Sequence, residues 1–382
     1  MKYNVFKSKS MGDISISGLG MGCMRLPVIV PGEEDIDYKR AEEVIDRAYS
    51  GGVNYYDTAI GYHDKGSEPF VGQALGKYPR DSFYLATKLS AWFLDEGRGV
   101  EDIFKWQQER LKTDYFDFYL CHNLNDHVYS ELKKADAYNR LSNLKKKGRI
   151  KNLGFSFHGS LELLDELISK YEWDFAQIQF NYLDTQFGSA MKEYEMLRRA
   201  GIPIAVMEPV RGGSLSDLCD DANKLLKSKR PNESISSWAI RYAASFDGVF
   251  TVLSGMSNIE QVEDNISTMS DFKPLTGEEK SLLSKAAACF KEFYTIPCTD
   301  CRYCMDVCPN AVNTPKLLKI YRGWKLDKNI SEYTKHYSSL DSAEKAEECS
   351  GCGVCVEKCP QSIKIPELLK EIAELNKSLD LK

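Results

Sequence analysis

The chain of 382 residues contains no apolar run long enough to cross a membrane, although 43% of its residues are hydrophobic. Residues 1–10 carry lysines but lack the apolar core of a secretion signal. The formal net charge is −6, and no basic stripe is available to bind a nucleic-acid backbone. These absences argue against a membrane or nucleic-acid-binding protein and predict a cytoplasmic one.

Cysteine is plentiful, but its spacing is not typical of a disulfide framework. Eight of the 12 cysteines form two runs with the pattern C-x2-C-x2-C-x3-C, each followed by proline. This is the bacterial ferredoxin pattern, in which the fourth cysteine of a run ligates the other cluster. The ligand sets expected for two 4Fe–4S clusters are Cys298, Cys301, Cys304 and Cys359, and Cys349, Cys352, Cys355 and Cys308. Zinc is the alternative, but zinc sites favour isolated C-x2-C pairs.

From Ile14 to about Phe272, short apolar runs alternate with amphipathic stretches, which is typical of parallel strands joined by helices. Strands are expected at 18–22, 53–57, 83–88, 116–122, 152–155, 175–180, 203–207 and 249–253. Eight such units in roughly 250 residues match a (β/α)8 TIM barrel of the α/β class. The segment 3–16 is expected to form a hairpin that closes the barrel floor.

The expected domains are the barrel at 1–275, a bridging helix at 276–295, and a small, mainly helical iron–sulfur domain at 296–382. Residues 310–348, between the two cysteine runs, have apolar residues at helical rather than strand spacing. The tail 366–379 is expected to form an amphipathic helix.

Three expected strands end on ionisable residues, namely Asp57, Lys88 and His122, and Tyr62 follows the first of them closely. Parallel α/β proteins display catalytic side chains at the carboxyl ends of their strands. Each residue alone is a weak signal, because an acid after a strand is often a helix cap and a loop tyrosine usually packs. Together they are stronger, since an ammonium beside a phenol favours release of the phenolic proton. The four residues therefore predict a proton-transfer site.

The order Asp, Tyr, Lys, His resembles the tetrad of the aldo-keto reductase family, as do Asp57-Thr58-Ala59, Gly61-Tyr62, Ser67-Glu68 and Ala86-Thr87-Lys88. The C-terminal part resembles a helical dicluster ferredoxin domain. The first resemblance implies hydride transfer from a nicotinamide to an aldehyde or ketone. It also implies that Tyr62 is the general acid, Lys88 assists it, Asp57 holds Lys88, and His122 orients the carbonyl oxygen.

The same resemblance implies positions that contact the nicotinamide cofactor. These positions are Gly22, Cys23, Ser156, Gln177, Met207, Arg211, Gly255, Ser257, Gln261 and Asn265. Ser156 and Gln177 would bind the carboxamide, and Met207 replaces the tyrosine that usually stacks under the ring. Where the family often has Lys or Arg, this chain has Gly255, Asn258 and Gln261, so the choice between NADP and NAD stays open. Arg211 is the nearby cation that could meet a phosphate.

The two halves handle electrons differently, because nicotinamide moves two as hydride and each cluster passes one. A flavin could convert between two-electron and one-electron transfer, but the sequence shows no recognisable flavin-binding motif. Three hypotheses follow: a nicotinamide-dependent carbonyl reductase with accessory clusters, a cluster-fed oxidoreductase with flavin or substrate at the barrel mouth, or a non-catalytic electron carrier. A redox partner protein at the iron–sulfur domain is compatible with all three.

Overall fold

The computed structural model describes residues 1–30, 33–94, 97–291, 295–379 and 381, except for the side chains of 326 and 327. The expected bridging helix 276–295 and C-terminal domain 296–382 extend over 292–294, 380 and 382, which lie outside the described residues. The chain divides into two compact units. The first comprises 1–210 and 232–284, and the second comprises 211–231 and 285–382.

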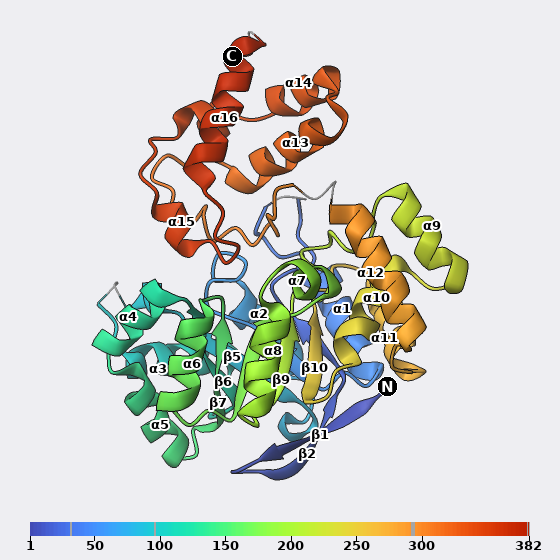
Figure 1. The fold of residues 1–382 in the computed structure, drawn as a ribbon. Helices are drawn as coiled ribbons and strands as arrows, with labels where there is room; N and C mark the ends of the chain where they lie inside the picture. Colours follow the sequence, from blue (N-terminus) through green and yellow to red (C-terminus); the bar gives the residue numbers. More distant parts are fainter. Residues whose placement is uncertain (31–32, 95–96, 292–294, 380, 382) are drawn as a thin grey trace. The chain divides into compact units, whose positions relative to one another are not determined.

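The first unit contains a closed barrel of parallel strands (Figure 1), in the order β10-β3-β4-β5-β6-β7-β8-β9. The strands are β3 (Leu19–Gly22), β4 (Tyr55–Asp57), β5 (Tyr84–Leu89), β6 (Phe116–Leu124), β7 (Ile150–Phe157), β8 (Phe175–Gln179), β9 (Ile204–Met207) and β10 (Val249–Ser254). The (β/α)8 class predicted from the alternation of strand and helix patterns is therefore confirmed.

Helices of the first unit surround the barrel (Figure 1). They are α1 (Tyr38–Ser50), α2 (Ser67–Leu75), α3 (Val100–Leu111), α4 (Asp126–Lys134), α5 (Ala137–Lys146), α6 (Leu161–Lys170), α7 (Tyr182–Phe187), α8 (Ala190–Arg199), α10 (Ile235–Ala244) and α11 (Ile259–Ser270). Helix α1 shows why such segments are helical. Its N-cap Asp37 accepts a hydrogen bond from the Arg40 backbone N–H, and its buried residues recur at helical spacing: Ala41, Val44, Ile45 and Ala48.

An antiparallel hairpin of β1 (Tyr3–Ser8) and β2 (Gly12–Ser17) supplies apolar side chains to the barrel interior. The Phe6 ring packs edge-on against Phe118 and Phe250, with centroids 5.2 and 4.9 Å apart. Ile16 joins the same buried cluster. The hairpin predicted to close the barrel thus contributes to the core itself.

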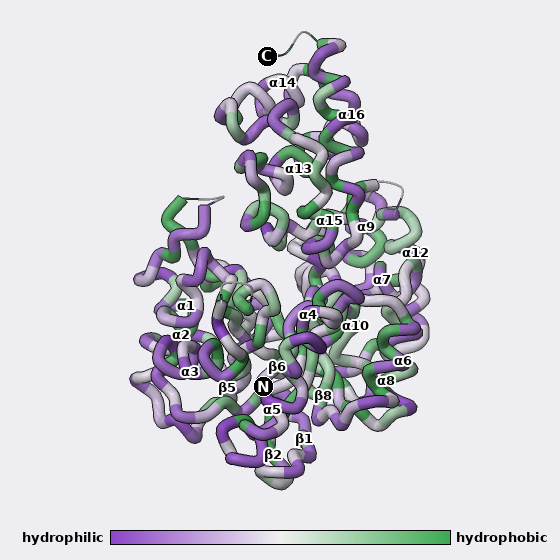
Figure 2. The backbone as a smooth tube through the Cα atoms, turned by 90° about the vertical axis from the view of Figure 1, so that its left-hand side faces the viewer, coloured by the Kyte–Doolittle hydropathy of each residue, from purple (hydrophilic) through white to green (hydrophobic). Residues whose placement is uncertain are grey.

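The second unit is helical, as predicted. It contains α9 (Asp220–Lys229), α13 (Thr314–Asp327), α14 (Ile330–Ser338), α15 (Val354–Lys358) and α16 (Ile365–Ser378). Hydrophilic and hydrophobic residues alternate along α16 (Figure 2), whose buried apolar residues are Ile365, Leu369 and Ile372. These residues pack in one core with Leu317 and Tyr321 of α13.

The division between the units falls within α12 (Gly277–Lys291), between Ser284 and Lys285. Residues 211–231, which the sequence places in the barrel domain, group with the second unit instead. The domain limits expected from the sequence therefore stay a prediction. None of the helices in the described parts of the chain combines the length and apolar composition that a membrane span requires.

The hairpin contact generates a prediction about stability. Phe6→Ala removes a ring that is 1% exposed, so we expect the free energy of unfolding of the barrel to fall by about 3–5 kcal/mol. Val5→Ala is the matched control, because the neighbouring Val5 is 66% exposed and its loss should cost less than about 0.5 kcal/mol. Urea unfolding followed by circular dichroism measures both, and equal losses would contradict the packing role of Phe6.

Candidate active site

The carboxyl ends of three adjacent strands bring the predicted tetrad together. Asp57 is the last residue of β4, Lys88 lies at the end of β5, and His122 lies near the end of β6. Parallel pairing aligns Asp57 with Ala86 of β5, which places its side chain close to Lys88. Tyr62 follows in the loop after β4, and all four side chains are buried.

The Lys88 ammonium is the centre of this site. Its Nζ donates to Asp57 Oδ1 at 2.6 Å, to the Thr58 carbonyl at 2.8 Å and to Tyr62 Oη at 3.2 Å. An ammonium has three donor protons, so these three acceptors satisfy it. Burial raises the pKa of Asp57, and the charge of Lys88 opposes that rise. The arrangement places the Lys88 amino group next to the phenol oxygen.

The His122 imidazole lies beside the phenol. Its ring centroid is 6.1 Å from that of Tyr62 and 5.3 Å from that of Trp92. Its Nδ1 lies 2.6 Å from Ser90 Oγ, a contact that no local sequence pattern predicts. Burial, and secondly the charge of Lys88, hold the pKa of His122 well below its usual range. Both effects favour the neutral imidazole.

A buried hydrogen-bond network contacts the backbone of Lys88. The Glu68 carboxylate is fully buried and accepts hydrogen bonds from Thr87 Oγ1 at 2.7 Å, Gln107 Nε2 at 2.8 Å and Arg110 Nε at 2.9 Å. Gln107 Nε2 also donates to the Lys88 carbonyl at 3.0 Å. Burial raises the pKa of Glu68, and its partners oppose that rise. The network fixes the backbone from which the Lys88 ammonium projects.

The residues expected to bind the carboxamide, Ser156 and Gln177, lie opposite each other on β7 and β8. Ser156 Oγ accepts the Asn123 backbone N–H at 2.7 Å, and Gln177 Nε2 contacts Met207 Sδ at 3.6 Å. Gln177 Oε1 is buried and has no hydrogen-bond partner among the residues described. A buried amide oxygen without a partner is costly, so it suits a ligand that donates an N–H. The nicotinamide carboxamide fits this requirement.

Asn123 is a polar residue of this region that sequence reasoning missed. It follows His122 at a register shift between β6 and β7, and its backbone is left-handed, with φ 58°. Neither its side-chain nitrogen nor its oxygen has a partner in the described structure, although the residue is buried. Such irregularities at strand ends redirect side chains. The signal available in the sequence was only that asparagine tolerates this backbone conformation.

The segment expected to meet the nucleotide phosphates joins β10 to α11. Asn265 Nδ2 donates to Ser254 Oγ at 2.9 Å, and the Ser257 backbone N–H donates to Gln261 Oε1 at 2.7 Å. A Cβ added at Gly22 would lie in ordinary van der Waals contact with the backbone of Ser254 and Gly255. The first and last barrel strands thus meet beside this segment, as the cofactor positions require.

The remaining expected positions are Cys23 and Arg211. Cys23 donates its backbone N–H to the Asp57 carbonyl at 2.8 Å, and burial raises the pKa of its thiol, so it lines the site as an unreactive residue. Arg211 belongs to the second unit, where its Nη2 donates to Gln361 Oε1 at 3.2 Å. Contact of Arg211 with a cofactor phosphate therefore stays a prediction.

A cation that sequence reasoning missed lies against the phosphate segment. The Arg25 side chain crosses Gly255, where a Cβ would come within 3.1 Å of Arg25 Cβ. Ser257 Oγ donates to the Arg25 carbonyl at 2.7 Å, and Arg25 Nη2 lies 3.7 Å from Glu208 Oε1. Arg25 follows β3 and is more than 200 positions from the segment, so a motif search within residues 253–265 misses it.

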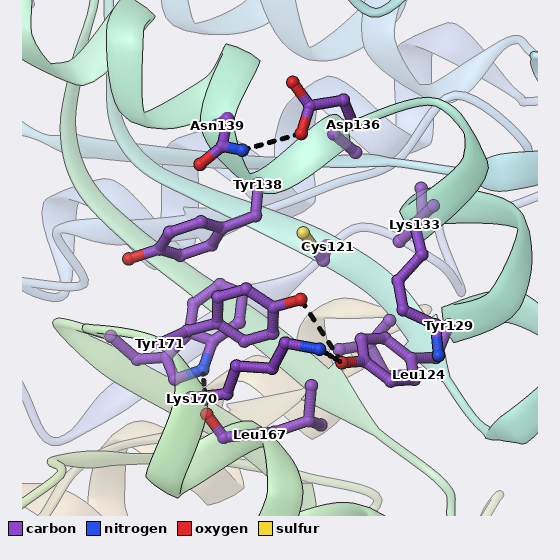
Figure 3. A pocket seen from close by; sticks show the side chains of 13 residues that line it. Cys121, Leu124, Tyr129, Lys133, Asp136, Tyr138, Asn139, Leu167, Lys170 and Tyr171 are labelled. Carbon is purple, nitrogen blue, oxygen red and sulfur yellow. Dashed lines mark hydrogen bonds between the residues drawn. The ribbon is translucent and has the colours of Figure 1, made fainter.

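Cys121 lies next to His122 on β6 but belongs to a different environment. Its thiol lines a cavity of about 120 Å³ between α4, α5 and α6 (Figure 3). Tyr129, Tyr138 and Tyr171 line the same cavity. Burial raises the pKa of this thiol to about 12, as is typical of an unreactive cysteine. These two neighbouring residues of β6 thus face different environments: His122 belongs to the site, and Cys121 lies against the outer helices.

The cysteine runs surround two small cavities in the second unit. Cys298, Cys301, Cys304 and Cys359 line one of them, together with Thr314 and Leu318. The other is lined by Cys349, Cys352, Cys355 and Cys308, again with Thr314. These are the two crossed ligand sets expected from the sequence. Within the described ranges, no group of three or more Cys, His, Asp or Glu side chains is placed closely enough to hold a single metal ion.

The site thus combines an acid, a tyrosine, a lysine and a histidine at neighbouring strand ends of a closed barrel. The sequence model of the aldo/keto reductase family matches residues 18–288, and that of the 4Fe-4S dicluster domain matches 297–364. The chain belongs to the aldo/keto reductase family and carries a 4Fe-4S dicluster domain C-terminal to the barrel. It is an oxidoreductase enzyme.

Several relatives share the barrel. An uncharacterised oxidoreductase YqkF of Bacillus subtilis is 27% identical over 70% of this chain and 91% of its own length. The NADH-specific methylglyoxal reductase of Escherichia coli is 24% identical over 68% of this chain and 91% of its own. The aldo-keto reductase AKR11C1 of Bacillus halodurans, solved in its holo form, is 26% identical, with a TM-score of 0.61 over 75% of this chain and 96% of that chain.

The crossed cysteine sets generate a prediction. Cys308→Ser should mainly disturb the cluster of Cys349, Cys352 and Cys355, because Cys308 faces the cavity of the other run. We expect iron to fall from about eight towards about four per chain, and the second unit to lose folded structure while the barrel keeps it. Iron and sulfide analysis with paramagnetic resonance measures this.

The control is Cys289→Ser, because Cys289 is exposed and lines neither cavity. It should leave the iron content unchanged. Bound zinc, a single cluster in the wild-type protein, or loss of the cluster next to Cys301 in Cys308→Ser would each contradict the crossed assignment.

Proposed function

We propose that this enzyme reduces an aldehyde or ketone by hydride transfer from NADH or NADPH, with Tyr62 as the general acid. One observation carries the proposal: the buried Lys88 ammonium binds Asp57 and Tyr62 at once, and His122 lies against the phenol. A phenol held between a cation and an imidazole at a barrel mouth is arranged to give up a proton. The match to the aldo/keto reductase family supports this chemistry.

When bound, the nicotinamide would supply the hydride that converts the carbonyl carbon to an alcohol carbon. Ser156 and Gln177 would hold its carboxamide, which agrees with the buried, unpartnered Gln177 Oε1. The oxygen gains negative charge as the hydride arrives, and Tyr62 gives it a proton, so that hydride and proton together yield the alcohol. Lys88 stabilises the resulting phenolate, and Asp57 keeps the ammonium in place.

Small carbonyl compounds are the proposed substrates, and the site is proposed not to prefer NADPH strongly over NADH. The Escherichia coli relative is named for NADH and methylglyoxal, which supports both points for a homologous barrel. Gly255, Asn258 and Gln261 offer no cation to a ribose 2′-phosphate. Arg25 is the cation beside the segment, but it lies 3.7 Å from Glu208, which partly neutralises it.

The two 4Fe–4S clusters are proposed to exchange electrons with a redox partner protein at the second unit.

A second candidate function is cluster-fed reduction at the barrel mouth. The Met207 side chain favours it, because a thioether replaces the aromatic ring expected under a nicotinamide. Absorption spectra of anaerobically purified protein separate the two. Cluster bands bleached by NADH, or flavin bands, would favour the second function, whereas carbonyl-dependent NADH oxidation with unchanged cluster bands supports the first.

Tyr62→Phe tests the acid. We expect carbonyl reduction to fall about a hundredfold or more with cofactor binding intact, because the proton donor is lost and the ring remains. Tyr55→Phe is the matched control, since the Tyr55 hydroxyl is buried and has no partner within the described structure. Steady-state rates and cofactor titration measure both variants. A Tyr62→Phe enzyme with wild-type rates would refute the assignment.

Cofactor choice is tested by titrating NADH and NADPH into the purified protein. We expect the two dissociation constants to differ by less than about a hundredfold, since a charged hydrogen bond that is missing from the site would be worth about 1.5–3 kcal/mol. A larger preference for NADPH would contradict this expectation. Arg25→Gln would then show whether Arg25 supplies the missing charge, with the exposed Arg40→Gln as control.

A further inference from the structure

Ser90 and His122 form a buried pair at the edge of the tetrad. Ser90 follows the last residue of β5, two positions after Lys88, and its Oγ lies 2.6 Å from His122 Nδ1. Ser90 is completely buried and His122 is 4% exposed. The contact is therefore shielded from water, and its two partners must satisfy each other.

The direction of this hydrogen bond follows from counting protons. In the part of the chain that the structure describes, His122 Nδ1 is the hydrogen-bond partner of the Ser90 hydroxyl. If Nδ1 carried the imidazole proton and donated it to Ser90, the buried hydroxyl proton would have no acceptor there. If Ser90 donates to Nδ1, its buried hydroxyl proton has an acceptor. A neutral imidazole that accepts at Nδ1 carries its proton on Nε2.

We propose that Ser90 is a positioning residue that selects the Nε2-protonated tautomer of neutral His122, so that His122 acts as a hydrogen-bond donor to the substrate oxygen. The opposite tautomer would present a lone pair at Nε2, which repels a developing alkoxide. The role of Ser90 in catalysis rests on the proposed carbonyl reduction. The tautomer itself is a property of the chain and does not depend on the substrate.

The surroundings of His122 keep the ring neutral while Ser90 orients it. Lys88 of β5 faces it with a positive charge, and His158, after β7, is a second imidazole nearby. Burial lowers the pKa of His158 to about 4, so it carries no charge at neutral pH. Tyr62 and Trp92 flank the ring and limit its rotation.

Nitrogen NMR of the full-length protein labelled at histidine reads the tautomer directly. The chain has five histidines, and His122→Gln identifies the signals of His122 by their loss. We expect wild-type His122 to show a protonated Nε2 and an unprotonated Nδ1. Ser90→Ala should give a mixture of tautomers, and Ser90→Thr, which keeps the hydroxyl, should restore the wild-type pattern. A protonated Nδ1 in the wild type, or an unchanged pattern in Ser90→Ala, would overturn the inference.

Kinetics supply the second readout. Ser90→Ala should lower kcat about three- to tenfold, the effect of one hydrogen bond, with little change in cofactor affinity. Because a hydrogen bond donated to Nδ1 favours the neutral ring, its loss should raise the pKa of His122 and move the acidic limb of the kcat profile to higher pH. Ser90→Thr should reverse both changes.

Ser17→Ala is the control, because Ser17 is also fully buried but bonds the Leu19 carbonyl before β3. It should leave kcat and the pH profile unchanged. A Ser90→Ala enzyme with wild-type kcat and pH profile would overturn the role of Ser90. If the wild type reduces no carbonyl compound, the proposed function fails, whereas the NMR result still decides the tautomer.

Discussion

The charge of Lys88 is the constraint on which the barrel site depends. Its side chain is completely buried, and removing an ammonium from water costs several kcal/mol unless every donor is satisfied. Asp57 supplies the opposite charge, and Thr58 and Tyr62 supply the other two acceptors. The pairing of β4 with β5 is therefore more than a scaffold, because a shift of one residue would move Asp57 away from Lys88. Folding and the chemistry of the site impose the same register.

Buried carboxylates stabilise both ends of the strands, but they differ in role. At the amino ends, Asp117 accepts the Leu85 backbone N–H and pairs with Arg80, and Asp174 accepts the Leu153 N–H and pairs with Lys145. These ion pairs connect neighbouring strands at the end of the barrel opposite the tetrad. At the carboxyl ends, Asp57 serves the ammonium instead. In this fold, residues at the amino-terminal end of the barrel usually serve stability, and residues at the carboxyl-terminal end usually serve catalysis.

The tetrad could be predicted because each member ends or follows an apolar run, so local pattern and position agree. Ser90, Asn123 and Arg25 could not, since each acts through a contact with a residue distant in sequence: His122, Ser156 and Gly255. Serine, asparagine and arginine are common in surface loops, so their composition gives no signal. The grouping of 211–231 with the second unit could not be predicted from the sequence either, because it depends on tertiary contacts and not on a change of composition.

The helical insert between the cysteine runs has a physical reason to exist. Thr314, at the start of α13, lines both cluster cavities, and Leu318, one turn later, lines the first. Leu317 and Tyr321 of the same helix belong to the apolar core with Ile365 and Leu369 of α16. One helix thus forms a wall of each cavity and part of the core. Because the cavity walls and the apolar core share α13, losing the clusters or the core packing removes support from the other.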